Sequence, residues 1–271
     1  MERIYIENGD DNLDKKYLFD EAVLNYEKRR PNYGTELFKD IIKYAEINMD
    51  KQAIEVGCGT GQATEPFIKT KCKVTAVELG EKLSSYTGEK FKAYENFKVV
   101  QSAFEDYNCD DNKFDMLYSA TAFHWIPDEI GYKKAYRILK NGGTIALFWN
   151  IPSTNDNPLH QKLQAIYNEL LPQWSYKAAN NEGKSKYSST LNKLEQYGFT
   201  NIEVKIYHNT RIMTGVEYIE LLNTYSDHLA LEKSIKLQLF DNIRTAIEEF
   251  GNEIIINDTV ELYLGQKPER Y

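Results

Sequence analysis

The chain has 271 residues, a formal net charge of −8, 42% hydrophobic residues and 27% charged residues. This size and balance are typical of one large α/β domain with additional elements, and the negative charge disfavours nucleic acids and anionic membranes as partners. The three cysteines show no C-x-x-C spacing, which favours a reducing, cytoplasmic compartment, and no apolar run approaches the ~18 residues of a membrane span.

The first fifty residues (1–50) are predicted to form a helical segment that contributes to a cap. Apolar residues spaced through 14–30 favour an amphipathic helix or two short ones. The run Arg30-Pro31-Asn32-Tyr33-Gly34 is typical of a turn, and the apolar spacing over 36–46 predicts a second helix.

Predicted strands and helices alternate in the next segment, 51–150. Short apolar runs predict the strands, and the segments between them have helical spacing. This alternation implies right-handed βαβ crossovers and a parallel sheet. The predicted strands are 53–56, 73–78, 97–101, 114–119 and 144–149, and the predicted helices are 62–69, 81–92 and 127–139.

The pattern changes in the last segment, 151–271. Residues 151–198 are interpreted as helices with polar connections, 202–214 as a long strand and 215–250 as helical. Residues 254–264 are predicted to form a closing strand. We therefore expect this segment to supply a helical cap insertion and the final two strands of the sheet.

The stretch A-I-E-V-G-C-G-T-G, residues 53–61, is the most informative motif. Gly57 and Gly59 allow a tight turn and a close approach of backbone to ligand, and Gly61 is expected to open a helix whose free N–H groups face the ligand. No G-K-[ST] follows, so the motif is not a phosphate-binding P-loop. The third glycine also comes one position early for the dinucleotide pattern G-x-G-x-x-G.

Two acidic residues indicate which chemical groups the ligand carries. Glu55 lies within the first strand, where a carboxylate is a poor neighbour for a pyrophosphate and a good one for an ammonium or sulfonium group. Glu78 ends the second strand, where an acid accepts hydrogen bonds from ribose hydroxyls. Ser102-Ala103-Phe104-Glu105-Asp106 follows the third strand and offers an apolar residue and an acceptor for an adenine.

Five motifs in order resemble those of class I S-adenosylmethionine-dependent methyltransferases. They read E-V-G-C-G-T-G, V-T-A-V-E-L, Q-S-A-F-E-D, F-D-M-L-Y-S-A-T-A-F-H-W and I-L-K-N-G-G-T-I-A-L-F. The small-molecule branch with type 11 and trans-aconitate methyltransferase-like enzymes is the most similar, because Tyr26 with Arg29-Arg30-Pro31 resembles its entry segment. The resemblance implies a Rossmann-like α/β fold, a seven-stranded, mostly parallel sheet with an antiparallel last strand, plus a helical cap.

The resemblance also implies which residues bind S-adenosylmethionine and its product S-adenosylhomocysteine. Cys58 is interpreted as a small loop residue rather than a nucleophile, because the sequence places no base beside it. No His/Cys/Asp cluster has metal-site spacing. The expected cofactor-binding residues are Arg30, Glu55, Gly57, Cys58, Gly59, Gly61, Glu78, Leu79, Ala103, Phe104, Glu105, Ser119 and Ala120.

The substrate-side candidates follow the fourth and fifth strands or lie in the cap. His124 is the candidate catalytic residue, as a general base or as an anchor for an anionic substrate, with a structural role as the alternative. Trp125 and Trp149 have core packing as an equal interpretation. The expected substrate-binding residues are Phe123, His124, Trp125, Trp149 and Tyr225.

The expected function is methyl transfer to a small molecule, with O-methylation of a carboxylate or hydroxyl favoured. The alternatives are an NAD(P)-linked oxidoreductase and a protein that binds S-adenosylmethionine without catalysis. The sequence leaves open the identity of the acceptor and whether the chain is a monomer or a homodimer.

Overall fold

The computed structural model describes residues 23–175 and 189–269, which divide into two compact units. Among the described residues, the first, here called the sheet unit, comprises 31–149, 189–207 and 260–269. The second, called the helical unit, comprises 23–30, 150–175 and 208–259.

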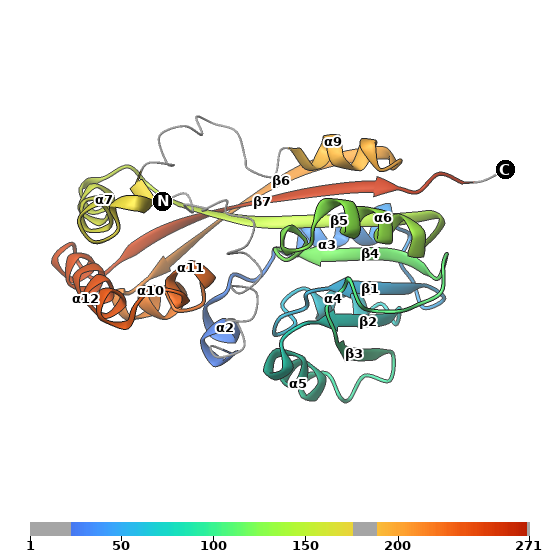
Figure 1. Ribbon diagram of the computed structural model, residues 1–271, viewed down its shortest axis with the longest axis horizontal. Coiled ribbons are helices and arrows are strands. Elements are labelled where there is room, and N and C mark those ends of the chain that lie inside the picture. Colours follow the sequence, from blue (N-terminus) through green and yellow to red (C-terminus); the bar gives the residue numbers. More distant parts are fainter. Residues whose placement is uncertain (1–22, 176–188, 270–271) are drawn as a thin grey trace. The chain divides into compact units, whose positions relative to one another are not determined.

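A seven-stranded sheet with the order β3-β2-β1-β4-β5-β7-β6 confirms the predicted α/β class (Figure 1). The pairs β1/β2, β1/β4, β2/β3 and β4/β5 are parallel. Strand β5 extends beyond the predicted 144–149 at both ends. The strands are β1 (Gln52–Val56), β2 (Lys73–Glu78), β3 (Phe97–Gln101), β4 (Phe114–Ala120), β5 (Leu139–Thr154), β6 (Thr200–Met213) and β7 (Ile254–Gln266).

The last strand, β7, runs antiparallel to its neighbour β5, as predicted. The N–H of Lys267, just past the end of β7, donates to the Gly143 carbonyl at 2.8 Å, and the Gly142 N–H donates to the Lys267 carbonyl at 2.8 Å. The end of β7 therefore lies beside the start of β5. The Asn201 side chain, near the start of β6, donates to Gln266 at 2.8 Å, so β6 and β7 are also antiparallel.

The helices of the sheet unit agree with the predictions except after the glycine motif. We expected a helix opening at Gly61, but residues 59–63 form turns and the helix begins at Thr64. Gly61 has φ +85°, which a right-handed helix does not accommodate. The helices are α3 (Thr35–Tyr44), α4 (Thr64–Ile68), α5 (Glu81–Lys90), the short 3-10 helix η2 (Phe123–Trp125), α6 (Asp128–Ile138) and α9 (Ser189–Gln196).

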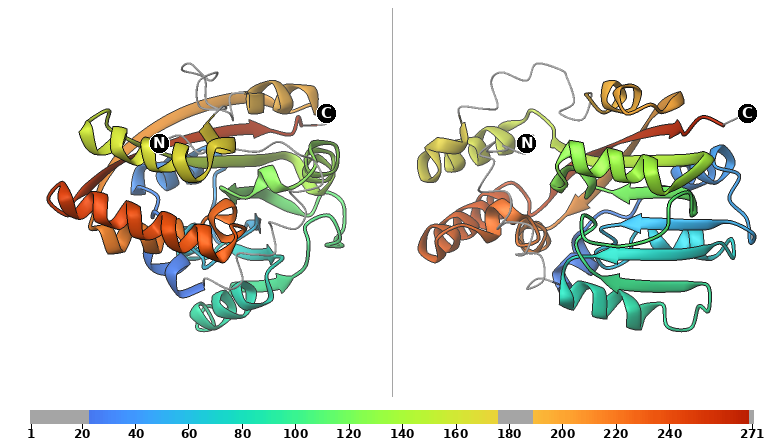
Figure 2. Two further views of the ribbon diagram at one scale, coloured as in Figure 1. Left: turned by 60° about the vertical axis from the view of Figure 1, so that its left-hand side comes forward. Right: turned by 45° about the vertical axis from the view of Figure 1, so that its right-hand side comes forward.

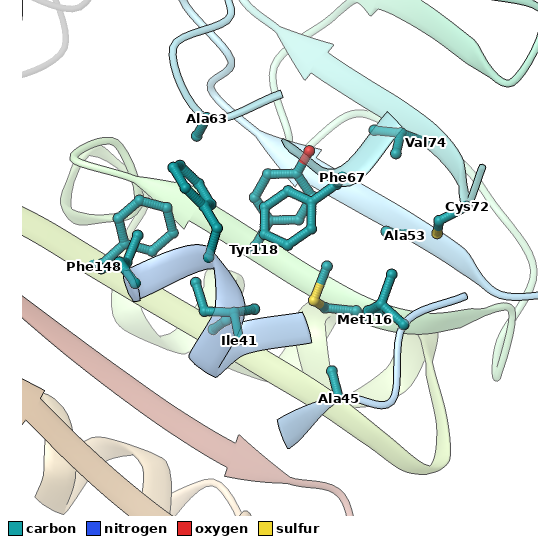
Figure 3. Packing of buried hydrophobic residues seen from close by; sticks show 14 of the residues in the cluster. Ile41, Ala45, Ala53, Ala63, Phe67, Cys72, Val74, Met116, Tyr118 and Phe148 are labelled. Atoms are coloured by element: carbon teal, nitrogen blue, oxygen red, sulfur yellow. The ribbon is translucent and has the colours of Figure 1, made fainter. Parts of the chain in front are cut away.

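The core of the sheet unit packs α3 and α4 against one face of the sheet (Figure 3). Side chains alternate between the two faces of a strand, so Glu55 lies on the same face as Ala53. Phe67 of α4 and Tyr118 of β4 are in ring contact, with centroids 4.3 Å apart. Glu55 and Tyr118 are register partners in the β1/β4 pair. This register places an acid directly beside a buried tyrosine.

The helical unit has its own core, in which α7 and α12 lie side by side (Figure 2). The predicted apolar face over 215–250 is confirmed by the burial of Leu221, Leu239 and Ile243. The parts of the predicted segments at 14–22 and 176–188 lie outside the described residues. The helices are α2 (Val23–Arg29), α7 (Pro158–Leu170), α8 (Pro172–Ser175), α10 (Gly215–Leu222), α11 (Ser226–Leu229) and α12 (Lys233–Glu249). Among the described helices, none has the length and apolar character required to cross a membrane.

Candidate functional site

The glycine motif forms a tight loop at the carboxyl end of β1. Gly57, Gly59 and Gly61 have φ values of +70°, +56° and +85°, a region that side-chain-bearing residues rarely adopt. A Cβ atom at Gly57 would lie 2.4 Å from the Cβ of Ala122. The loop is therefore pressed against the segment that follows β4, and only glycine fits at its first position.

Glu78, the last residue of β2, holds the loop through its backbone. Its Oε2 accepts a hydrogen bond from the Gly59 N–H at 2.8 Å, and its Oε1 accepts one from the Gly80 N–H at 3.0 Å. On the other side, Thr87 of α5 donates to the Gly59 carbonyl at 2.6 Å. Both oxygens of the Glu78 carboxylate thus accept backbone N–H groups at the strand ends, and its contact with ribose hydroxyls stays a prediction.

Glu55 is fully buried beneath the loop and is only partly satisfied. Thr64 Oγ1 donates to its Oε2 at 2.7 Å and Tyr118 Oη donates at 3.0 Å. Its Oε1 is buried and has no hydrogen-bond partner among the described residues. Burial, with a smaller contribution from the charge of Glu78, raises the pKa of Glu55 to about 7, although the two hydroxyl bonds oppose the rise. An unpartnered carboxylate oxygen here suits a cationic ligand group.

The segment after β3 forms a turn that is tied to the end of β2. The Ser102 N–H donates to the Glu78 carbonyl at 2.9 Å, and the Ala103 carbonyl accepts from the N–H groups of Asp106 and Tyr107. Phe104 is buried, with its ring centroid 6.3 Å from that of Phe123. The predicted adenine residues therefore lie on a structured turn at the correct end of the sheet, and their contact with a ligand stays a prediction.

The segment after β4 contains a constrained residue that the sequence analysis missed. Thr121 has φ +54°, which is rare for a β-branched side chain, and such strain concentrates at functional sites. Its N–H donates to the Phe148 carbonyl at 2.8 Å, and its Oγ1 is hydrogen-bonded to Tyr33 Oη at 2.8 Å. The sequence placed its partner Tyr33 in a Pro-Gly turn but gave no sign that the two residues meet. Ser119, a predicted site residue, donates to the Val56 carbonyl at 2.8 Å.

His124 and Trp149, predicted as separate candidates, form a hydrogen-bonded pair. Trp149 Nε1 donates to His124 Nδ1 at 3.1 Å. An imidazole that accepts at Nδ1 carries its proton on Nε2 when neutral, so this bond selects one tautomer. Trp149 is buried against Tyr263, and the ring of Trp125 lies 5.0 Å from that of His124. The site therefore presents an oriented N–H group from His124.

The remaining predicted residues fall in different environments. Cys58 is buried in the loop, and burial raises the pKa of its thiol well above the ordinary value, which keeps it protonated. Leu79 directly follows β2, and Ala120 ends β4. Arg30 and Tyr225 belong to the helical unit, and their roles toward a ligand stay predictions.

Arg30 has well-defined contacts within the helical unit. Its guanidinium carbon lies 4.7 Å from the ring centroids of both Tyr26 and Tyr225. Its Nη2 donates to the Thr224 carbonyl at 2.5 Å. These cation–π contacts hold the guanidinium between two aromatic rings. Across residues 23–175 and 189–269, no cluster of three or more His, Cys, Asp or Glu side chains is arranged to hold a metal ion.

In comparison with known proteins, a family model described as "Methyltransferase domain" matches residues 54–147. An uncharacterized methyltransferase of Schizosaccharomyces pombe is 23% identical over 222 residues, 81% of this chain and 83% of that protein. Malonyl-[acyl-carrier protein] O-methyltransferase 1 of Ilyobacter polytropus is 27% identical over 186 residues, 68% of this chain and 61% of that protein.

Two further relatives align over a smaller part of the chain, and a solved structure matches it in fold. Uncharacterized methyltransferases of S. pombe and Mycobacterium bovis align over about half of their own length, 51% and 54%. The structure of Haemonchus contortus phosphoethanolamine N-methyltransferase 2, solved with phosphomonomethylethanolamine and S-adenosylhomocysteine, matches with a TM-score of 0.56 and 16% identity. That match covers 97% of this chain and 61% of that chain, and it confirms the fold.

Substituting Gly57 with alanine tests the loop geometry. We expect Gly57→Ala to lower the free energy of unfolding by on the order of 2 kcal/mol, because the new Cβ requires a left-handed backbone and meets Ala122. Gly34→Ala is the matched control, since a Cβ there has open space and φ is −65°. Urea denaturation of both variants measures the effect, and equal stability of the two would contradict the geometry.

Replacing Glu55 by glutamine tests the buried acid. The pKa of Glu55 is about 7 in the folded state and 4.5 in the ordinary, unfolded state. Protonated Glu55 therefore contributes its full stability below about pH 4.5, and this contribution is lost as the pH rises through 7. We expect Glu55→Gln to match the wild type near pH 4 and to be more stable by roughly 3 kcal/mol near pH 8.

Denaturant unfolding across this pH range provides the measurement for Glu55→Gln. Glu65→Gln on α4 is the control, because it makes the same substitution at a side chain that is 50% exposed. A stability difference between Glu55→Gln and the wild type that does not vary with pH rules out a raised pKa at Glu55.

Proposed function

We propose that this chain, a class I S-adenosylmethionine-dependent methyltransferase, methylates an oxygen atom of a small molecule, with a carboxylate favoured over a hydroxyl. The observation that carries the proposal is the set of oriented groups at the carboxyl ends of β1, β2 and β4. It consists of the buried carboxylates of Glu55 and Glu78, the glycine loop, and the His124–Trp149 pair.

The residues around the glycine loop fit the cofactor. S-adenosylmethionine, when bound, supplies a methyl group already activated on a sulfonium. Glu55 offers a buried carboxylate oxygen to a cationic group. We assign the carboxylate of Glu78, which accepts the Gly59 N–H of the loop, to the ribose hydroxyls. We assign Ala103–Glu105 to the adenine and Ser119–Ala120 to the methionine part. The role of these residues is to orient both reactants and exclude water, which lowers the barrier without a protein nucleophile.

The His124–Trp149 bond supports a carboxylate acceptor. A carboxylate is ionised at neutral pH and needs no base, whereas a hydroxyl has to lose a proton. The Nδ1 lone pair of His124 is engaged by the Trp149 N–H, so the neutral ring offers a donor at Nε2. We therefore assign His124 as an anchor for an anionic acceptor. The name of the I. polytropus relative, an O-methyltransferase, agrees with an oxygen acceptor.

The nicotinamide alternative has no support from a specific observation. The methyltransferase family match covers the loop itself, and the acid at Glu55 disfavours a pyrophosphate. We further place the protein in the small-molecule branch with trans-aconitate methyltransferase-like enzymes and in the cytoplasm. The Tyr26/Arg29-Arg30-Pro31 segment supports the branch, and the free thiols of Cys58, Cys72 and Cys109 support a reducing compartment.

Calorimetric titration and an acceptor panel test the proposed function. We expect S-adenosylmethionine and S-adenosylhomocysteine to bind and NAD to show no binding. Small carboxylic acids should increase the release of S-adenosylhomocysteine more than alcohols do. A carboxylate reacts without a base, whereas a hydroxyl group has to lose its proton to one. Failure to bind S-adenosylhomocysteine, or turnover with amines alone, contradicts the proposal.

Substituting His124 separates an anchor from a base. As an anchor, His124→Ala should raise the KM for the acceptor about tenfold and leave kcat nearly unchanged at saturation. A general base would instead lower kcat by roughly 10²-fold to 10⁴-fold. Steady-state kinetics against the acceptor make the measurement, with His208→Ala, at an exposed histidine of β6, as the control. A large fall in kcat with unchanged KM excludes the anchor role.

A further inference from the structure

Lys134 of α6 is a buried ammonium whose hydrogen bonds all go to one short segment of backbone. The residue is 8% exposed. Its Nζ donates to the carbonyl oxygens of Phe104 at 2.5 Å, Glu105 at 2.9 Å and Tyr107 at 2.5 Å. An ammonium has three N–H donors, so these bonds use its full capacity. Nζ also lies 5.1 Å from the centroid of the Phe104 ring.

This arrangement is unusual for a lysine. Lysine is rarely fully buried unless it is paired with an acid, because removing its charge from water is costly. None of the three hydrogen-bond partners of Lys134 is a carboxylate, and burial lowers the pKa of its ammonium. The next residue, Lys133, shows the ordinary case, with a side chain 67% exposed beside Glu129. The nearby charges of Asp106 and Glu105 favour the charged form, but the direct hydrogen bonds of the ammonium go to carbonyl oxygens.

The segment that Lys134 holds is the turn after β3. Other hydrogen bonds also hold this turn. The Ser102 N–H donates to the Glu78 carbonyl, and the Ser102 hydroxyl and the N–H groups of Asp106 and Tyr107 donate to the Ala103 carbonyl. The Lys134 ammonium adds three further hydrogen bonds, because it donates to three carbonyl oxygens of this segment at once. The same side chain therefore fixes three peptide orientations and contacts the Phe104 ring.

We propose that Lys134 is a positioning residue, which holds the turn 103–107 in the form that receives the adenine of S-adenosylmethionine. The inference rests on the proposed function, since that function assigns Ala103–Glu105 to the adenine. Without the ammonium, three carbonyls lose their donor and the turn has to be ordered when the cofactor binds. Cofactor affinity should therefore fall, while methyl transfer from the bound cofactor should change little.

The test compares Lys134→Met with the matched control Lys133→Met. We expect Lys134→Met to raise the Kd for S-adenosylhomocysteine and the KM for S-adenosylmethionine about tenfold, with kcat changed less than about twofold. Lys133→Met should leave all three values unchanged. Amide hydrogen exchange without ligand gives a readout independent of catalysis, and residues 103–107 should exchange faster in Lys134→Met alone.

The outcomes separate the inference from the proposed function. Wild-type protein that binds no S-adenosylhomocysteine overturns the proposed function. A folded Lys134→Met variant that binds it as tightly as the wild type overturns the role of Lys134 and leaves the function standing. If Lys134→Met does not fold, Lys134→Gln decides, since its amide keeps two donors. An intermediate Kd then supports the role, and a wild-type Kd overturns it.

Discussion

The hydrogen bond from the Gly59 N–H to the carboxylate of Glu78 is the contact around which the site is organised. It joins the loop after β1 to the end of β2, and the loop in turn presses on Ala122 after β4. The turn after β3 is tied to the same point through the Glu78 carbonyl. The ends of β1, β2 and β3 are thus joined through Glu78, and the segment after β4 packs on the same loop.

The sequence predicted the fold well because the periodic signals of this chain are strong. The parallel strands of the sheet unit are short apolar runs, and their alternation with helical segments implies a parallel sheet. The limits of β5 were less predictable, since its polar start at Lys140–Gly143 is ordered by pairing with Lys267, far away in sequence. The start of α4 was misplaced because a positive φ at Gly61 leaves no periodic signal.

Candidate site residues could be predicted where a chemically informative side chain lies at or near the end of a strand. They could not be predicted where their role depends on contacts made by tertiary packing. Glu55 and Glu78 stand out because acids at strand ends are chemically informative. Thr121 and Lys134 did not, since a threonine after a strand and a lysine on a helix have many ordinary roles. The tautomer of His124 depends on Trp149, whose partner no sequence pattern identifies.

The position of β7 has a consequence for how the chain folds. β7 is an inner strand, between β5 and β6, although α10, α11 and α12 separate it from β6 along the sequence. During synthesis, the edges of β5 and β6 remain open until these helices have been made and β7 arrives. Unpaired strand edges are templates for aggregation, and such long-range pairing is slow. Newly made chains therefore pass through an interval in which two strand edges of the unfinished sheet are exposed.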